Sequence, residues 1–245
     1  MNKIADFKRM KTLAGGTFVP FIRYNLKLVF GGKFRYFLGV AVLIFIGLSL
    51  VRVFGVETRP SEADAFTLVL LSSLLVVFYP SAFSIQNDMD ARMIEILFGI
   101  PDYRYKVWLV RLIVMWVVTT GIDLILGTLF SVLVVDVPLV MLTMHVLVPT
   151  VCIASAVFMI STLVKSGNAT AVIIVIVILG LWVFREPVQD AVWFPFLNPY
   201  AIPTDMPESI WADRVMYNRL SLTVGAAVFL LWGLFNLQNR ERYVS

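Results

Sequence analysis

The sequence predicts an all-α membrane protein of one domain with six transmembrane helices, and three observations support this prediction. Of its 245 residues, 60% are apolar and 15% are charged, whereas about a quarter of the residues in soluble domains are charged. The apolar residues form six runs, each near the roughly 20 residues that a helix needs to cross a bilayer. The longest segments without such a run are 1–35 and 185–219. Both are shorter than the smallest domains, which have about 50 residues, so no separate catalytic domain is expected. The predicted spans are 36–54, 65–85, 107–135, 138–164, 169–184 and 220–237.

The distribution of Lys and Arg predicts how these spans are oriented. If both termini lie on the same side of the membrane, that side holds 15 of the 20 basic residues, and the opposite side holds most of the acidic ones. Loops on the cytoplasmic side of a membrane protein carry the excess of Lys and Arg. Both termini are therefore expected in the cytoplasm.

The segment before the first span predicts an N-terminal interfacial helix over Pro20–Phe30. Its apolar residues recur along one face at helical spacing, while Arg23 and Lys27 share another face. A proline in the first turn and a Gly-Gly pair just past the end are the expected start and stop signals. The two cations would meet anionic lipid headgroups. Membrane lipid is thus an expected partner, and nucleic acid is not, because no aromatic and basic binding surface accompanies the charges.

Several motifs of catalysis and metal binding are missing from the sequence. No phosphate-binding G-x-x-x-x-G-K-[ST] loop occurs, so ATP hydrolysis is not expected in this chain. His145 is the one histidine and Cys152 the one cysteine, which argues against a histidine-rich metal site and an intrachain disulfide. No G-x-S-x-G nucleophile motif occurs either. We therefore expect no catalytic residue, no metal and no cofactor in this chain.

Residues 86–106, between the second and third spans, predict a short amphipathic helix on the cytoplasmic side. Its apolar residues recur at helical spacing on one face, and Asp88, Arg92 and Glu95 occupy another. Asp88 and Glu95 are each placed to pair with Arg92. A glycine and Pro101 follow as stop signals. The pattern leaves two roles open, a helix lying on the bilayer surface and a helix that docks on another protein.

This segment, with the start of the third span, resembles the signature of ABC-2 type transporter permeases. That signature has an acidic and basic stretch, a Glu within a Leu-rich turn, a Pro and an Arg, followed by a long span that opens with a basic residue. The matching residues are Asp88, Asp90, Glu95, Leu97, Pro101, Arg104 and Arg111. The sequence departs from the pattern at Arg92, where the family usually has a small residue such as Gly. The predicted architecture, with an entry helix, six spans and cytoplasmic termini, is also similar to that of the family.

The resemblance implies a role in transport. In the family, the helix after the second span is the coupling helix, which docks on a separate ATPase subunit that holds ATP and Mg. Two permease copies, identical or closely related, would form the path of an exporter in a bacterial cytoplasmic membrane. The residues that the resemblance assigns to the coupling helix are Asp88, Asp90, Arg92, Glu95, Pro101 and Arg104. Two other functions stay open, an ion-coupled secondary transporter and a membrane protein with an assembly or structural role.

The segment before the last span, residues 185–219, is rich in aromatic residues and prolines. Aromatic side chains gather at membrane interfaces, and prolines interrupt helices. The family resemblance implies that this segment folds as short external helices that cap the pathway. An ordinary loop with aromatic anchors is the alternative.

Asp123 and His145 are the titratable residues placed deepest in the predicted spans. The third and fourth spans are joined by a very short turn, so both residues are expected at similar depths in the outer half of the membrane. Charged side chains there usually face the bundle interior and have a partner. The sequence predicts that Asp123 is satisfied by His145 or by neutral donors such as Thr119 and Thr143. A proton-binding or substrate-binding role for the pair is the alternative.

Overall fold

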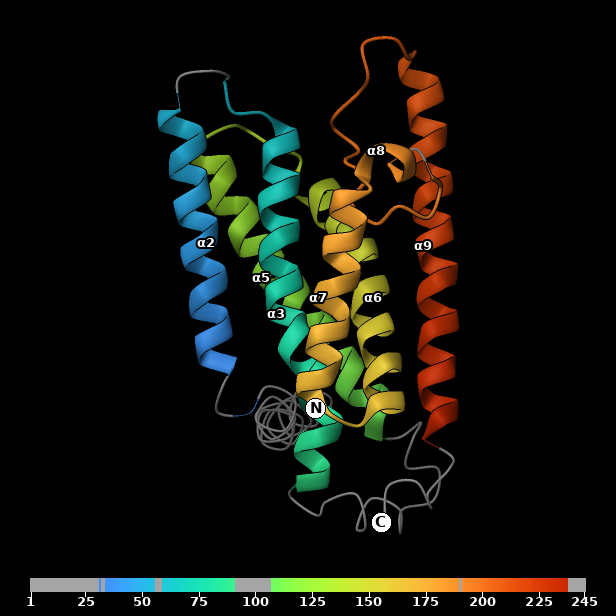
Figure 1. Ribbon diagram of the computed structural model, residues 1–245. Coiled ribbons are helices and arrows are strands. Elements are labelled where there is room, and N and C mark those ends of the chain that lie inside the picture. The colour runs from blue at the N-terminus through green and yellow to red at the C-terminus, as the bar shows by residue number, and fades with distance from the viewer. Residues whose placement is uncertain (1–30, 32–33, 56–58, 91–106, 190, 238–245) are drawn as a thin grey trace, which may run out of the picture.

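The computed structural model describes residues 31, 34–55, 59–90, 107–189 and 191–237, and these residues form helices joined by turns, with no strand among them. Among the described residues, six long helices form a bundle in which each runs opposite to the long helix before it (Figure 1). We call the end at which the first helix begins and the last helix finishes the lower end, as drawn in Figure 1, and the other the upper end. The helices are α2 (Phe34–Phe54), α3 (Glu62–Asp90), α5 (Leu109–Leu133), α6 (Leu139–Val164), α7 (Gly167–Val183), the one-turn α8 (Arg185–Val188) and α9 (Glu208–Asn236).

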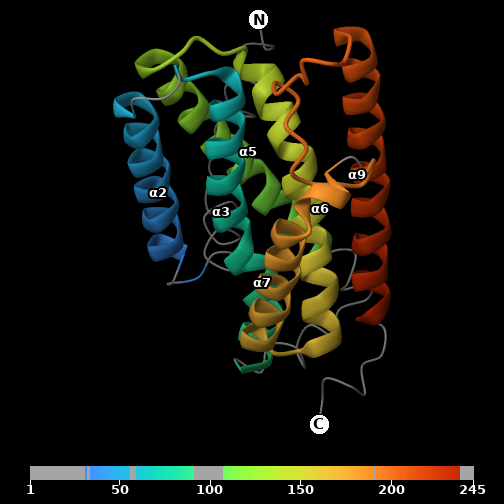
Figure 2. The same ribbon diagram turned by 45° about the horizontal axis from the view of Figure 1, so that its top comes forward.

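The arrangement places α3 at the centre of the bundle. It contacts α2, α5, α6 and α7, whereas α9 packs against α6. As a result α2 and α9 lie at opposite edges of the bundle, as both views show (Figure 1, Figure 2). The central position of α3 explains why it has the longest set of buried residues, which includes Ser72 and Ser73.

The surface of the bundle is apolar. Large side chains such as Val132 on α5, Ile176 on α7 and Leu231 on α9 are exposed. Contiguous exposed apolar surface of this extent is not found on soluble monomers and is expected where helices contact lipid. Five helices, α2, α3, α5, α6 and α9, are long and apolar enough to cross a membrane. The described part of the chain therefore fits an integral membrane protein, and the all-helical prediction is confirmed.

The sixth predicted span, 169–184, corresponds to α7, which has 17 residues. A helix of that length is about 25 Å long, somewhat less than the roughly 30 Å of the hydrocarbon core. The helix begins after a two-residue turn, because Lys165 adopts a left-handed conformation with φ 60° and ends α6. Ser166 then caps α7 by accepting a hydrogen bond from the Ala169 N–H, at 3.4 Å. The count of six spans thus stays a prediction.

Two helices extend beyond their predicted ends, and both extensions matter for function. α3 begins at Glu62, where Ser61 and Asp64 form a capping arrangement, with the Ser61 N–H and hydroxyl donating to the Asp64 carboxylate at 3.0 and 2.9 Å. At its other end it continues to Asp90, so Asp88 and Asp90 belong to its last turn and not to a separate helix.

α9 begins at Glu208, immediately after Pro207, and not at residue 220 as predicted. Polar residues in its first three turns hid this start from a search for apolar runs. The expected short external helices are therefore represented among the described residues by α8 alone, and residues 208–219 are the upper part of α9. The predicted interfacial helix, with Arg23 and Lys27, lies outside the described residues.

Candidate functional site

Among the residues assigned to the coupling helix, Asp88 lies in a buried ion pair at the lower end of the bundle. Its carboxylate accepts a hydrogen bond from an Nη1–H of Arg111 on α5. The Arg111 side chain is 7% exposed and that of Asp88 11%. The guanidinium also lies over the ring of Trp108, 4.8 Å from its centroid. The sequence pattern paired Asp88 with Arg92; the structure shows that its partner is Arg111, a residue that sequence analysis noted only as a match to the family signature.

This pair joins the two helices that flank residues 91–106. Asp90, the next candidate, is exposed, and its carboxylate accepts a weak hydrogen bond of 3.4 Å from Gln86 on the same helix. The side-chain oxygen of Gln86 accepts a 2.6 Å hydrogen bond from the Gly167 N–H, which links α3 to the start of α7. The remaining coupling-helix candidates, Arg92, Glu95, Pro101 and Arg104, lie outside the described residues.

A second polar site lies in the middle of the bundle around Asp123, which is completely buried. The hydroxyl of Ser73 on α3 donates a hydrogen bond to its Oδ1 atom, and Oδ2 has no partner within the described ranges. Thr119 and Thr143 instead donate to carbonyl oxygens of their own helices, at 2.9 and 2.8 Å. A neutral donor does bind one oxygen of Asp123, as expected, but it comes from a third helix, α3.

The predicted pairing of Asp123 with His145 is wrong. Asp123 lies on the face of α5 that packs against α3, whereas the ring of His145 on α6 meets the ring of Tyr200 edge to face, with centroids 5.9 Å apart. Depth in the membrane, which the sequence predicts, places two residues at one level. Only the rotation of each helix about its axis decides whether they face each other.

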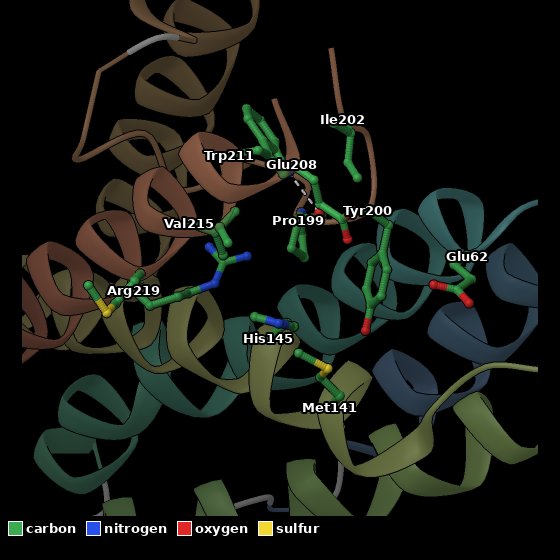
Figure 3. Close-up of a pocket in the computed structure, with 12 residues that line it drawn as sticks. Glu62, Met141, His145, Pro199, Tyr200, Ile202, Glu208, Trp211, Val215 and Arg219 are labelled. Carbon is green, nitrogen blue, oxygen red and sulfur yellow. Dashed lines mark hydrogen bonds between the residues drawn. The ribbon is translucent and has the colours of Figure 1, made fainter. Parts of the chain in front are cut away.

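A cavity of ≈ 580 Å³ with several polar side chains in its lining lies at the upper end, between α6, α9 and the segment 191–206 that joins α8 to α9 (Figure 3). We call this segment the cap segment. His145 contributes from α6, Tyr200 from the cap segment, and Trp211 and Arg219 from α9. A volume of this size suits a ligand as large as a drug molecule.

Buried and part-buried hydrogen bonds hold the cap segment in place. Asn218 on α9 donates to the carbonyl oxygens of Val192 and Phe194, both at 2.9 Å, and it is completely buried. Asn198 donates to the Ala63 carbonyl on α3 at 2.8 Å. The Trp211 indole N–H donates to the Pro199 carbonyl, also at 2.8 Å. The aromatic and proline-rich sequence is thus a fixed wall of the cavity.

Two polar groups of this wall lack partners. The Arg219 guanidinium donates to the carbonyl oxygen of Leu197 at 3.1 Å and to Asn218 Oδ1 at 2.6 Å, but its buried Nε–H has no partner in the part of the chain that the structure describes. The same is true of the buried hydroxyl of Tyr200. Burial raises the pKa of Tyr200 to about 12, with a smaller contribution from Glu62 in the same direction and an opposing one from Arg219. The hydroxyl therefore stays protonated near neutral pH and can donate.

Sequence analysis missed three residues of these sites. Ser73 is a small polar residue inside an apolar run, and so is its neighbour Ser72, whose hydroxyl donates only to backbone oxygens. The sequence therefore does not distinguish the serine that binds Asp123 from the one that does not. Arg219 directly precedes the predicted last span, so the sequence places it outside the membrane. The third, Tyr200, was one of several aromatic residues of the segment. Ser73 and Arg219 share one signal that could have found them, since each is a polar residue within or next to an apolar run. Tyr200 has no such signal.

The described residues contain no group of three or more His, Cys, Asp or Glu side chains that could hold a metal ion. Their fold and sites define an all-helical membrane protein with one buried ion pair, one buried carboxylate and one upper cavity. Comparison with protein-family models, with curated proteins and with solved structures gives no match to this chain.

Proposed function

We propose that this chain is the transmembrane permease subunit of an ATP-driven ABC-2 type exporter. It would form the translocation path as a dimer, with a second copy or a close paralogue, and would be coupled to a separate ATPase subunit that binds ATP and Mg. The observation that carries the proposal is the ion pair between Asp88 and Arg111, together with the resemblance of the segment between them to the permease signature.

Force from the ATPase would reach the bundle through residues 91–106. Coupling between two proteins requires a contact whose free energy differs between their states. Residues 91–106 connect the lower ends of α3 and α5, and the buried pair ties these two ends together. A push on the segment would therefore displace α3 and α5 as one unit. Since α3 contacts α2, α5, α6 and α7, a displacement at its lower end would reach most of the bundle.

The test reverses the charges of the proposed coupling helix. The chain carrying Arg92→Glu and Glu95→Arg would be affinity-purified from native membranes and compared with the unaltered chain. We expect the unaltered chain to co-purify with an ATPase that has a phosphate-binding loop, and the double variant to lose the ATPase or the stimulation of its ATP hydrolysis. Membrane insertion should not change.

The matched control is Arg185→Glu with Glu186→Arg, which reverses an adjacent, exposed pair of charges on α8 near the opposite end of the bundle. This control should retain the ATPase. If the coupling-helix variant retains ATPase binding and stimulation as the control does, the proposed function is wrong.

A second candidate function, an ion-coupled secondary transporter, is favoured by one observation. Asp123 is buried in the bundle and has one carboxylate oxygen without a partner among the described residues. Intramembrane carboxylates of this kind often bind protons in carriers. The purified chain in liposomes loaded with a pH-sensitive dye should then conduct protons under an imposed potential without any ATPase, and Asp123→Asn should abolish the conduction. Equal proton fluxes in both proteins would exclude this candidate.

A further inference from the structure

An apolar groove adjoins the upper cavity and shares two lining residues with it. The groove, of ≈ 750 Å³, runs along residues 137–145, which form the turn before α6 and the first turns of that helix. Met141 and His145 line both the cavity and the groove. Val140 and Met144, in the groove, are 72% and 59% exposed, so it opens toward the surface that faces lipid. A polar chamber and an apolar channel thus share one wall.

Two buried donors that line the chamber have no acceptor among the described residues. Arg219 forms no ion pair with any carboxylate in the described ranges, and its Nε–H is unpartnered. The Tyr200 hydroxyl, which lines the same cavity, is also unpartnered. Buried donors without acceptors cost free energy, and a buried cation without a counterion costs more. An acidic group placed between them would satisfy both.

The two carboxylates of the cavity lie elsewhere in it. Glu208 begins α9, and the 11 residues from there to Arg219 correspond to about 16 Å along the helix axis. Glu62 lies on the far side of Tyr200 from Arg219, as Figure 3 shows. Glu208 is exposed and Glu62 is part-exposed, so water screens their charges more than that of Arg219. The guanidinium therefore sets the field at its own end of the cavity, whereas at the Tyr200 hydroxyl Glu62 has a larger effect than Arg219.

We propose that this cavity is a binding site for an acidic amphiphile, with a phosphate or carboxylate group held by Arg219 and the Tyr200 hydroxyl and an apolar chain lying in the groove beside Met144. The ligand reaches the site sideways from the bilayer, because the groove opens there. Trp211 lines the chamber, and its indole N–H donates a hydrogen bond to the Pro199 carbonyl. The inference does not depend on the ATPase, and the proposed exporter function does not depend on this site.

The test uses two lipids that differ only in the acidic group, dioleoyl phosphatidic acid and dioleoylglycerol. The full-length chain, purified in a neutral detergent, would be titrated with each, and the retained lipid would be measured by native mass spectrometry. We expect phosphatidic acid to bind at least about tenfold more tightly than dioleoylglycerol, as the loss of a charge-assisted hydrogen bond implies. Arg219→Met should remove that difference, and Tyr200→Phe should reduce it. Arg185→Met, which removes an exposed arginine on α8, is the matched control and should bind as the unaltered chain does.

A further variant tests the groove without altering the buried cation. Met144→Trp adds bulk at an exposed position of the groove and should weaken phosphatidic acid binding severalfold while the protein stays folded. Water-soluble glycerol 3-phosphate should compete only at far higher concentrations than the lipid. Equal binding of the two lipids, equal phosphatidic acid binding by Arg219→Met and the control, or competition by glycerol 3-phosphate at the concentration of the lipid would each overturn the proposal.

Discussion

Asp88 and Arg111 lie 23 positions apart in the chain and form a buried ion pair that closes the lower end of the bundle. The pair joins the last turn of α3 to the first turn of α5. A buried ion pair adds little stability over an apolar pair of similar size, but removal of one partner leaves an uncompensated charge. The relationship therefore has consequences that mutation can measure.

The first prediction concerns this pair. Arg111→Met should lower the free energy of unfolding by about 3–5 kcal/mol, because it leaves the Asp88 carboxylate buried without a cation. The double variant Asp88→Leu with Arg111→Met should lose less than the single variant, since neither charge remains. Unfolding in detergent, followed by circular dichroism, would measure both.

Its control is the ion pair between Arg52 and Asp64, whose atoms are 3.2 Å apart but whose arginine side chain is 54% exposed. Arg52→Met should cost about 1 kcal/mol or less, as for other exposed pairs. A double variant at the buried site that loses as much as the sum of its two single variants would contradict the predicted coupling.

The second prediction concerns Ser73 and Asp123. Ser73→Ala removes the hydrogen bond to a fully buried carboxylate and should cost about 1–3 kcal/mol of stability. Ser84→Ala, at a half-buried position of the same helix, should change stability by less than about 0.5 kcal/mol. Equal melting temperatures for the two variants would show that the bond contributes nothing.

The third prediction concerns the close packing of α9 on α6. A Cβ atom added at Gly233 would lie 2.8 Å from the ring of Phe158, which is completely buried, and 3.3 Å from the Met159 backbone. Gly233→Ala should therefore cost about 1–3 kcal/mol through overpacking.

Gly225, on the same helix, provides the comparison. A Cβ atom there would meet the Cys152 sulfur at 3.6 Å, an ordinary contact. Gly225→Ala should be neutral or should stabilise by up to about 1 kcal/mol, because alanine favours the helix. Thermal unfolding of the two variants side by side tests the difference, and the reverse order would contradict the described packing.

The fourth prediction concerns topology. In a chain whose buried cysteine is replaced, Cys152→Ala, single cysteines would be introduced as Asp205→Cys near the upper end and Asp90→Cys at the lower end. A membrane-impermeant thiol reagent added to intact cells should label Asp205→Cys only, since the positive-inside rule places the lower end in the cytoplasm. After the cells are opened, Asp90→Cys should be labelled as well. Labelling of both in intact cells would overturn the orientation.

The sequence predicted several helices closely because their limits coincide with the limits of apolar runs. The predicted span 138–164 corresponds to α6 at Leu139–Val164, and 36–54 corresponds to α2 at Phe34–Phe54. Pro138 marks the start of α6, where a proline is well tolerated. The same reasoning failed at the lower end of α3 and the upper end of α9, where polar residues continue the helix past the apolar run. A helix continues through backbone hydrogen bonds until a stop signal occurs, whether its residues are polar or apolar. Hydropathy marks only the apolar part of the helix.

By itself, the sequence determined that this chain forms apolar helices and which side chains among them would need partners. Only the tertiary structure decided which residues those partners are. Asp88 pairs with Arg111, and Asp123 accepts a hydrogen bond from Ser73. Arg219 lines the same cavity as Tyr200. The physical reason is that helices which are apolar on nearly every side carry no periodic pattern to indicate which side faces the bundle interior. The rotation of each helix follows from the packing of all the others, and the pairing of a buried polar side chain follows from that rotation.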